Sequence, residues 1–430
     1  MKKLFCLFLS ALCILGVTAC GGEETPPTAD KTHMYGFFEP LWEKRANSNE
    51  DQVIGFNRDV TVDLMGAMGC NSFRMMFPAS IFSKFIVDYE DGTIEVELDE
   101  EMVPYFHESI EKLHSAGIGF IVGEGIVLPP FVTDAGQSVP AGMLGVPVYG
   151  TDACYETWSE AVSEAWTLLV SEFDEITYWE MGNEYNADAF FHPATYNPDT
   201  KQGGFAIDES AAANTDYMYF ANRGILAGNS EAVTLTPGWT SLGNMASREI
   251  EYFLGYVYDN IKSGDFPRVG EKSTDSDDYF GGFSWHPYHG MPMNEDWVEY
   301  NNDIYQLAID NGDDGKPVIF TEMGWFDSNS PDLIASQSEA AKLVYRYCME
   351  EMRYVESCLW FRFYNCEYDW AGLGANSPEK TYGVFYEPTS TEGFKPKQKA
   401  LVMQEIFGGT GNLEMWSDLE KLNEKLAEDR

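Results

Sequence analysis

Eight short apolar runs recur along the chain, and stretches with helical spacing of apolar residues separate most of them. The runs predict β-strands over residues 34–38, 72–77, 119–123, 176–181, 232–236, 282–286, 317–321 and 358–363. The stretches between them predict helices over residues 101–116, 158–173, 211–227, 248–262, 298–310 and 339–355. Strands that alternate with helices are typical of right-handed βαβ units and a parallel sheet. Eight strands favour a closed barrel over an open doubly wound sheet, and no Gly-rich phosphate fingerprint follows the first strand.

The length of the chain fits this interpretation. Its 430 residues, 44% of them hydrophobic and 15% aromatic, suffice for one barrel with long loops. Long segments follow three of the predicted strands, at residues 128–151, 187–210 and 365–396, and loops on that side of a barrel build its active site. We therefore predict an α/β fold with a single (β/α)₈ barrel over residues 32–409, followed by a charged helix over residues 410–430.

The first residues are typical of a targeting segment. Two lysines precede an apolar stretch at residues 4–17, which is too short and wrongly flanked for a transmembrane helix. It ends in Val17-Thr18-Ala19-Cys20-Gly21, which resembles the bacterial lipoprotein signal with its lipidated cysteine. An ordinary signal peptide with a chance cysteine is the alternative. We predict a signal peptide over 1–19, lipidation at Cys20, a flexible tether over 20–31, and an outward-facing location on the bacterial envelope with no other membrane contact.

Charge and cysteine content exclude several function classes. A net charge of −43 repels a phosphate backbone, so we expect no nucleic acid partner. Without a local basic pocket, the same field disfavours strongly anionic polymers as substrates. The cysteines outside the signal segment are odd in number and lack the spacing of a disulfide framework or a zinc site. The acidic run at residues 310–315 lacks the spaced ligands of a calcium loop, so we predict no metal site.

Two glutamates carry the strongest functional signal. Glu184 follows the fourth predicted strand, and Glu322 ends the seventh. A carboxylate at the C-terminal end of a barrel strand lies where such barrels keep their chemistry. Two carboxylates that face one pocket are the minimum equipment for cleaving a glycosidic bond.

The sequences around these glutamates resemble the clan A glycoside hydrolases, the retaining (β/α)₈ enzymes. They read Trp179-Glu180-Met181-Gly182-Asn183-Glu184 and Thr321-Glu322-Met323-Gly324-Trp325. The resemblance extends through strand order from Met34 to Phe407, and it implies that Glu184 is the acid/base and Glu322 the nucleophile. Many clan members have a Trp before the Asn-Glu pair and a Pro after it, where this chain has Gly182 and Tyr185, so the family within the clan is not assigned.

Four further residues fit the resemblance. The clan often has an Arg beside the nucleophile, which matches Arg74, and a guanidinium there keeps a carboxylate ionised. His286 and Tyr288 match its His-x-Tyr, whose Tyr hydroxyl contacts the nucleophile, and Asn183 would hold the sugar 2-hydroxyl. The alternatives are a surface ion pair for Arg74 and a structural role for His286. A metal site on His286 and His289 is disfavoured because no helix aligns them.

Aromatic side chains near strand ends are candidates for sugar stacking, since they offer flat apolar surfaces. They are Trp325, Trp239, Trp360 and Tyr364, each with core packing as the alternative. The last two belong to strand eight, where the clan often has an aromatic platform under the cleaved sugar. Rival carboxylates are Glu39, Glu124 and Glu180; we interpret Glu180 as an internal hydrogen-bonding group, and Glu124 could line the cleft.

These observations predict a monomeric, lipid-anchored retaining β-glycosidase that acts on a polysaccharide or oligosaccharide, in an endo mode, by double displacement. We also predict no cofactor, because double displacement by two carboxyl groups requires none. Two alternatives stay open. One is a non-catalytic glycan-binding surface lipoprotein on the same fold, and the other is a transglycosylase, which would share every residue.

Overall fold

The structure is a computed structural model, and it describes residues 34–41, 44–46, 53–55, 58–132, 138–139, 145–147, 154–197, 200, 202–241, 249–264, 272–289, 295–325, 331–365, 378–386 and 395–417. The chain separates into two units, Met1–His33 and Met34–Arg430, and the described residues belong to the second. The predicted signal peptide, the tether and Cys20 lie outside the described residues. So does most of the predicted C-terminal helix; its first part, 410–417, contains a turn at 413–416 and no helix.

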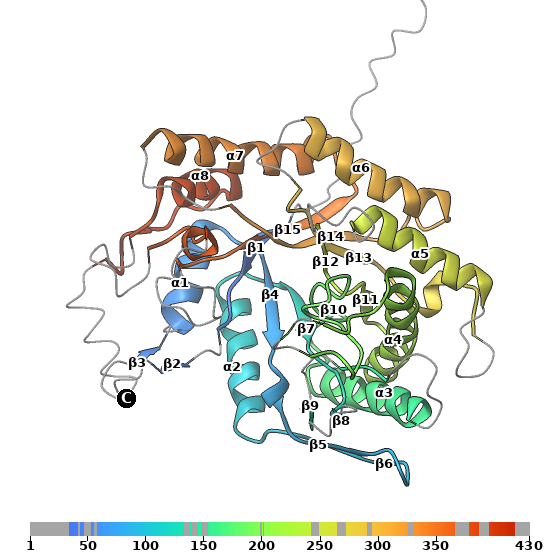
Figure 1. The fold of residues 1–430 in the computed structure, drawn as a ribbon. Helices are drawn as coiled ribbons and strands as arrows, with labels where there is room; N and C mark the ends of the chain where they lie inside the picture. The colour runs from blue at the N-terminus through green and yellow to red at the C-terminus, as the bar shows by residue number, and fades with distance from the viewer. Residues whose placement is uncertain are drawn as a thin grey trace, which may run out of the picture. The chain divides into compact units, whose positions relative to one another are not determined.

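Parallel strands form the central sheet. Its nine segments are β1 (Met34–Phe38), β4 (Ser72–Phe77), β7 (Phe120–Gly125), β10 (Tyr178–Glu180), β11 (Val233–Leu235), β12 (Trp239–Thr240), β13 (Phe283–His286), β14 (Val318–Met323) and β15 (Val355–Phe361). They are hydrogen-bonded in the order β11-β10-β7-β4-β1-β15-β14-β13-β12. Because β11 and β12 are successive parts of one strand, and Leu235 bridges Gly282 beside β13, the sheet closes on itself. The predicted (β/α)₈ barrel is confirmed (Figure 1).

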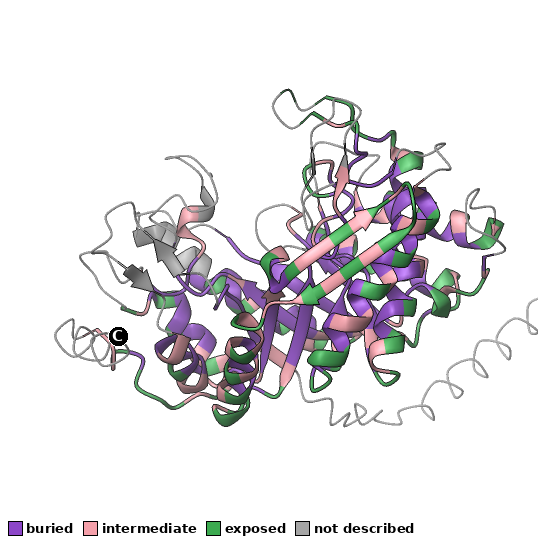
Figure 2. Cartoon of the chain, turned by 90° about the horizontal axis from the view of Figure 1, so that it is seen from below, coloured by how far each residue is buried: buried purple, intermediate pink, exposed green. Residues whose placement is uncertain are grey.

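Helices surround this sheet (Figure 1). They are α1 (Arg58–Met68), α2 (Met102–Ser115), α3 (Tyr155–Glu172), α4 (Ile207–Gly228), α5 (Ile250–Ser263), α6 (Glu295–Asp310), α7 (Pro331–Glu350) and α8 (Gln398–Phe407). Their sheet-facing sides are buried and their outer sides exposed, as amphipathic spacing predicts (Figure 2). The sequence analysis missed α1 and α8. In α1, three consecutive β-branched residues and a glycine lower the intrinsic helix propensity, and tertiary packing overrides it.

Three hairpins were also missed: β2 (Lys44–Ala46) with β3 (Val53–Gly55), β5 (Phe82–Asp88) with β6 (Thr93–Leu98), and β8 (Phe131–Val132) with β9 (Ser138–Val139). The β5–β6 hairpin is inserted between β4 and α2, and exposure alternates along β6. This alternation is the period-two pattern of a strand with one covered face. No helix among the described residues is both long and apolar enough to cross a bilayer.

The barrel interior has two layers of different chemistry. The apolar layer consists of Val122, Leu235, Ile319 and Leu359, which pack on one another. The charged layer consists of Arg74, Glu124, Glu180 and Glu322, and all four are buried. On β7 the two layers are two residues apart, at Val122 and Glu124, and the charged one lies nearer the carboxyl end of the strand. Successive inward-facing positions therefore change from packing to chemistry.

Candidate active site

The loop that carries Glu184 is tied to the fifth barrel strand. The Glu184 backbone has φ 55°, a left-handed conformation that is uncommon for a residue with a side chain. Its N–H donates to the carbonyl of Gly238 at 3.2 Å. Asn186 exchanges two hydrogen bonds with the backbone of Thr240, at 2.7 and 3.0 Å. These bonds offset the local strain and fix where the carboxyl group points.

Two glycines near this loop are required by close approach. Gly182 has φ 120°, and a Cβ there would lie 2.3 Å from the ring of Tyr185. This explains why the chain has Gly182, and not a Trp, before the Asn-Glu pair. A Cβ on Gly238 would lie 2.5 Å from Glu180 Oε1 and 2.8 Å from His286 Nε2. The backbone at Gly238 therefore packs directly on two site residues.

Glu322 reaches the site through an irregularity in β14. The register with β15 shifts between Phe320 and Met323. Such a bulge re-aims side chains, and here Thr321 and Glu322, although adjacent in sequence, both contact interior groups. Thr321 Oγ1 donates to Glu180 Oε1 at 2.6 Å, and Arg74 Nη1 donates to Glu322 Oε2 at 3.1 Å. The other oxygen of Glu322 accepts the hydroxyl of Tyr288 at 2.8 Å.

Arg74 is the centre of the charged layer. Its Nε donates to Glu180 Oε2 at 2.6 Å, and its Nη2 donates to Asn183 Oδ1 at 2.9 Å. Nη2 also lies 3.4 Å from Glu124 Oε2. Burial lowers the pKa of Arg74, but the surrounding carboxylates outweigh it, so the guanidinium stays charged. A single cation therefore serves three buried carboxyl groups.

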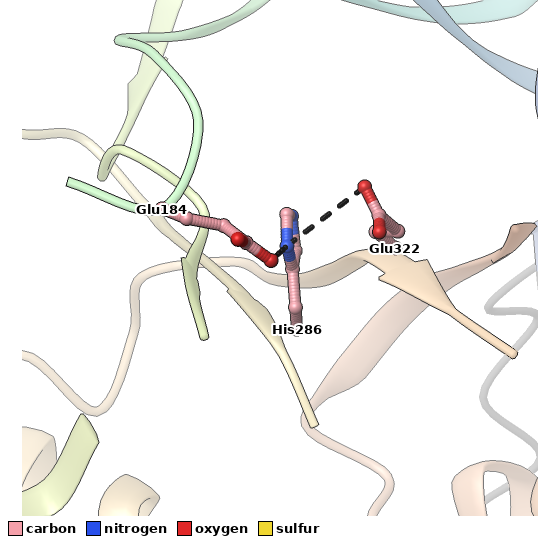
Figure 3. Close-up of side chains that lie close together, drawn as sticks. All are labelled: Glu184, His286 and Glu322. Atoms are coloured by element: carbon pink, nitrogen blue, oxygen red, sulfur yellow. Dashed lines mark hydrogen bonds and ion pairs between the residues drawn. The ribbon is translucent and has the colours of Figure 1, made fainter. Parts of the chain in front are cut away.

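His286 lies between the two predicted catalytic carboxyls (Figure 3). Its Nδ1 is 3.0 Å from Glu184 Oε1 and 3.9 Å from Glu322 Oε2. One oxygen of each glutamate and a ring nitrogen of His286 all lie within 4.8 Å of one another. Retaining glycosidases hold their two carboxyl groups about 5–5.5 Å apart, and inverting enzymes about 6.5–9.5 Å. The spacing is closer to that of the retaining enzymes than to that of the inverting ones.

The same three residues could in principle ligate a divalent cation. The nearby guanidinium argues against it, because Arg74 already donates to Glu322 Oε2 at 3.1 Å. A metal ion on that oxygen would be repelled by a fixed positive charge within a few ångströms. The donor set is thus better matched to an organic substrate than to a metal.

The electrostatic environment separates the two glutamates. Burial raises the pKa of Glu184 to about 7, against smaller lowering effects of Thr240 and Arg74. Burial and the charge of Glu184 also raise the pKa of Glu322, and His286, Arg74 and Tyr288 oppose that rise only in part. Burial lowers the pKa of His286 to about 4, so the imidazole is neutral near pH 7. Glu184 is therefore suited to hold a proton. Glu322 has the cationic partner Arg74 and the hydrogen-bond donor Tyr288 that stabilise a carboxylate.

The strand-end aromatics are not where the sequence analysis expected them. Trp239 pairs in register with Trp285 and packs edge-on against Phe253 of α5, so it faces the helices, whereas Thr240, next along the strand, pairs with His286. Because neighbours in register share a face, the predicted sugar contact at Trp239 is wrong. The ring is only 1% exposed.

The same correction applies to strand eight. Trp360 is 1% exposed, with Lys399 of α8 over its ring at 5.7 Å. The hydroxyl of Tyr364 lies 3.2 Å from Thr61 of α1, so this side chain also belongs to the helix side. Neither residue presents a face to a sugar. Trp325 is buried too and meets Trp360 edge to face, with ring centroids 5.3 Å apart.

The structure places different aromatics on the inner side of the strands. Phe361 is half-buried; it stacks on Phe38 at 5.6 Å and meets Tyr382 edge-on at 6.1 Å. Phe38 in turn lies under the guanidinium of Arg74 at 4.6 Å, which places this pair on the site side of the strands. The sequence analysis missed Phe361 and Tyr382. Because side chains alternate along a strand and Leu359 faces inward, Phe361 should face inward as well, and this pattern could have identified it as a site residue.

Glu39 proves to be structural. It pairs with Arg362 at 2.8 Å and accepts the backbone N–H groups of Phe363 and Tyr364. This buried cluster holds the end of the eighth strand against the first. Glu180 is confirmed as an internal hydrogen-bonding group by its bonds to Arg74 and Thr321.

Comparison with known proteins places the fold. No family model matches the chain, and no curated protein matches it. Among solved structures it is similar to a family 39 glycoside hydrolase from the gut symbiont Bacteroides cellulosilyticus WH2, with TM-score 0.52 and 15% identity over 88% of this chain and 65% of that one. Xylanase 10B from Thermotoga maritima gives 0.52 and 15%, over 88% and 95%. The β-glycosidase from Thermosphaera aggregans gives 0.54 and 16%, over 88% and 96%.

These neighbours are glycoside hydrolases of clan A with the same curled parallel sheet. At such low identity the likeness shows the fold alone. The chain spans slightly less than two thirds of the family 39 structure.

Proposed function

We propose that this protein is a retaining β-glycosidase with Glu322 as nucleophile and Glu184 as acid/base. The observation that carries the proposal is the approach of the two carboxyls to within 4.8 Å of each other and of the His286 ring. Their side chains are 16% and 12% exposed, so both have an opening to solvent. That combination of spacing and access is what a glycosidic bond lying between them requires.

In the proposed first step, an oxygen of Glu322 attacks the anomeric carbon while Glu184 gives its proton to the leaving oxygen. The bond to the leaving sugar breaks and a glycosyl-enzyme ester forms. In the second step Glu184, now ionised, takes a proton from water, and that water displaces Glu322. The raised pKa of Glu184 supports the acid role because the group holds its proton near pH 7.

Neighbouring groups have defined roles in this scheme. Arg74 and Tyr288 hold Glu322 in place, which reduces the entropy lost on attack. Asn183 has its carbonyl oxygen bound by Arg74, which directs its amide NH₂ toward the substrate side to donate to the sugar 2-hydroxyl. Phe361 and Tyr382 form the apolar wall on which the cleaved sugar packs.

We propose endo action on a β-linked polysaccharide by a protein anchored to the cell envelope through lipid on Cys20. Structural neighbours in complex with xylobiose and with Manβ1-4GlcNAc support a β-linked substrate. The anchor is tested by membrane partition: Cys20→Ala should release the protein or block its processing, and wild type found free in the medium would contradict it.

The function is tested on a panel of β-linked polysaccharides with reducing-end detection and product chromatography. Endo action predicts intermediate oligosaccharides at early times, and exo action predicts a single small product. For the substrate that is cleaved, proton NMR should show the β-anomer first, with slow mutarotation to the α-anomer. An α-anomer formed first would overturn the retaining mechanism. If acceptor sugars are added and the main product is the glycosyl group joined to the acceptor, the protein is a transglycosylase.

A further inference from the structure

Glu124 is the buried carboxyl for which the proposed mechanism has no use. It lies on β7, in register with Glu180 on β10, so the two side chains share the interior face. Its side chain is 0% exposed. Neither of its carboxyl oxygens has a hydrogen-bond partner among the described residues, and its closest charged neighbour is Arg74 Nη2 at 3.4 Å.

Its two competitors for Arg74 are much better satisfied. Glu180 accepts Arg74 Nε and the hydroxyl of Thr321, both at 2.6 Å. Glu322 accepts Arg74 Nη1 at 3.1 Å and the hydroxyl of Tyr288 at 2.8 Å. With one guanidinium among three buried carboxyls, full ionisation would leave negative charge uncompensated in a low-dielectric interior. The proton resides on the group with the weakest bonds, which is Glu124.

We propose that Glu124 is a positioning residue that must stay protonated for Arg74 to hold the nucleophile Glu322 in its attacking position. This inference rests on the function proposed above. While Glu124 is neutral, Arg74 is divided between Glu180, Glu322 and Asn183. Once Glu124 loses its proton, it competes for Nη2 and draws the guanidinium away from Glu322 and Asn183. The carboxyl thus makes the nucleophile sensitive to pH without touching substrate.

The groups that face Glu124 are Arg74, Glu180, Glu322 and Glu184. Burial and, to a smaller extent, the charges of Tyr217 and Glu124 raise the pKa of Tyr185. Burial and the three other carboxylates raise the pKa of Glu124 to about 7, while Arg74 lowers it. Glu184 titrates in the same range. An experiment on Glu124 must therefore remove the titration of Glu184 first.

The test uses the Glu184→Ala background with an aryl glycoside whose leaving group needs no acid. In that background the burst reports attack by Glu322 alone. Between about pH 6 and about pH 8 the burst rate should fall about tenfold, because a group that titrates near pH 7 passes from mostly protonated to mostly ionised over that interval. Adding Glu124→Gln, which cannot ionise, should abolish this fall.

Glu249→Gln in the same background is the matched control, because Glu249 bonds Ser241 and Tyr300 and has no bond to Arg74. It should keep the fall, and Glu124→Asp should keep it with a moved midpoint. A flat profile in Glu184→Ala, or a fall that survives Glu124→Gln, would overturn the inference and leave the glycosidase intact. Failure of Glu184→Ala to give any burst would instead refute the proposed function, and the inference with it.

A second measurement needs no substitution at Glu124. Difference infrared spectra of Glu184→Ala between about pH 6 and about pH 8 should show the loss of one protonated-carboxyl band, because Glu124 titrates over that interval. Absence of that band would overturn the inference even if the Glu124 variants failed to fold.

Discussion

The interior of the barrel changes character within two residues along a strand. In the apolar layer, Val122, Leu235, Ile319 and Leu359 pack on one another and are 0% exposed. In the charged layer just beyond it, Arg74, Glu124 and Glu180 are also 0% exposed, and Glu322 is 9% exposed. Burial stabilises the first layer by about 25 cal/mol per Å² of apolar surface. In the second layer burial costs free energy, and hydrogen bonds to one guanidinium offset part of that cost.

The difference separates stability from function. Packing within the apolar layer depends only on the shape and volume of the side chains. That layer therefore tolerates substitution by apolar residues of similar volume. The charged layer depends on exact partners, because removing one leaves another buried and unsatisfied. Substitutions in or beside the charged layer should therefore act mainly on catalysis, and substitutions in the apolar layer mainly on stability.

Glu322→Ala removes the proposed nucleophile from the charged layer. Hydrolysis of natural and activated aryl glycosides alike should fall by at least about 10⁴-fold, since both need covalent attack. Azide should restore turnover of the activated substrate and give the α-glycosyl azide by direct displacement. Steady-state rates and NMR of the azide product measure this. A β-azide would show that another residue is the nucleophile.

Glu184→Ala removes the acid and base but keeps the nucleophile. Turnover of the natural glycan should fall by about 10²–10⁴-fold, while an activated aryl glycoside should give a burst followed by slow turnover. Azide should speed the second step and yield the β-glycosyl azide. Identical behaviour of the two alanine variants would refute the assignment of roles, and Glu124 or Glu180 would become the next candidate.

Leu359→Ala tests the apolar layer. The free energy of unfolding should fall by about 2–5 kcal/mol, because a fully buried leucine leaves a cavity. The kcat of the folded protein should stay within about twofold, since the side chain belongs to the apolar cluster and has no polar partner. Denaturant titration and kinetics on the same preparation measure both. A large loss of kcat at unchanged stability would contradict the separation of the layers.

Glu184→Gln measures how the buried carboxyl of Glu184, beside the charged layer, changes the free energy of unfolding with pH. The pKa of Glu184 is raised to about 7, so its favourable contribution is complete below the unfolded value of about 4.3 and is lost as the pH rises through about 7. The variant should therefore gain about 1–3 kcal/mol relative to wild type between about pH 4 and about pH 8. Unfolding curves across that range measure the gain. If the difference in free energy of unfolding between variant and wild type did not change with pH, the pKa of Glu184 would not be raised.

Much of this structure could be predicted from the sequence because buried barrel strands are short apolar runs that local pattern reveals. β1 and β4 have the predicted bounds, since each is an apolar run with a sharp end. The grouping of Glu184, Glu322, Arg74 and Tyr288 followed from their places at strand ends, which all meet at one edge of the barrel. Local pattern was enough wherever topology brought the residues together.

The aromatic wall could not be placed so simply. Trp360 is the more conspicuous residue, but side-chain direction alternates along a strand, and Phe361 faces the site. Tyr382 comes from the segment after the eighth strand, whose path no periodicity describes. The isolation of Glu124 depends on three distances to Arg74, and a sequence contains none of them.

The central claim is that Glu322 forms a covalent bond to the sugar. The most direct measurement uses a 2-deoxy-2-fluoro β-glycoside with a good leaving group, matched to the sugar that the wild type cleaves. The fluorine slows both steps, and the leaving group lets the first proceed, so the glycosyl-enzyme accumulates. Mass spectrometry of the digested protein should find one sugar residue on the peptide that contains Glu322, and none in Glu322→Ala. A label on Glu184, Glu124 or Glu180, or inactivation without any covalent adduct, would contradict the account.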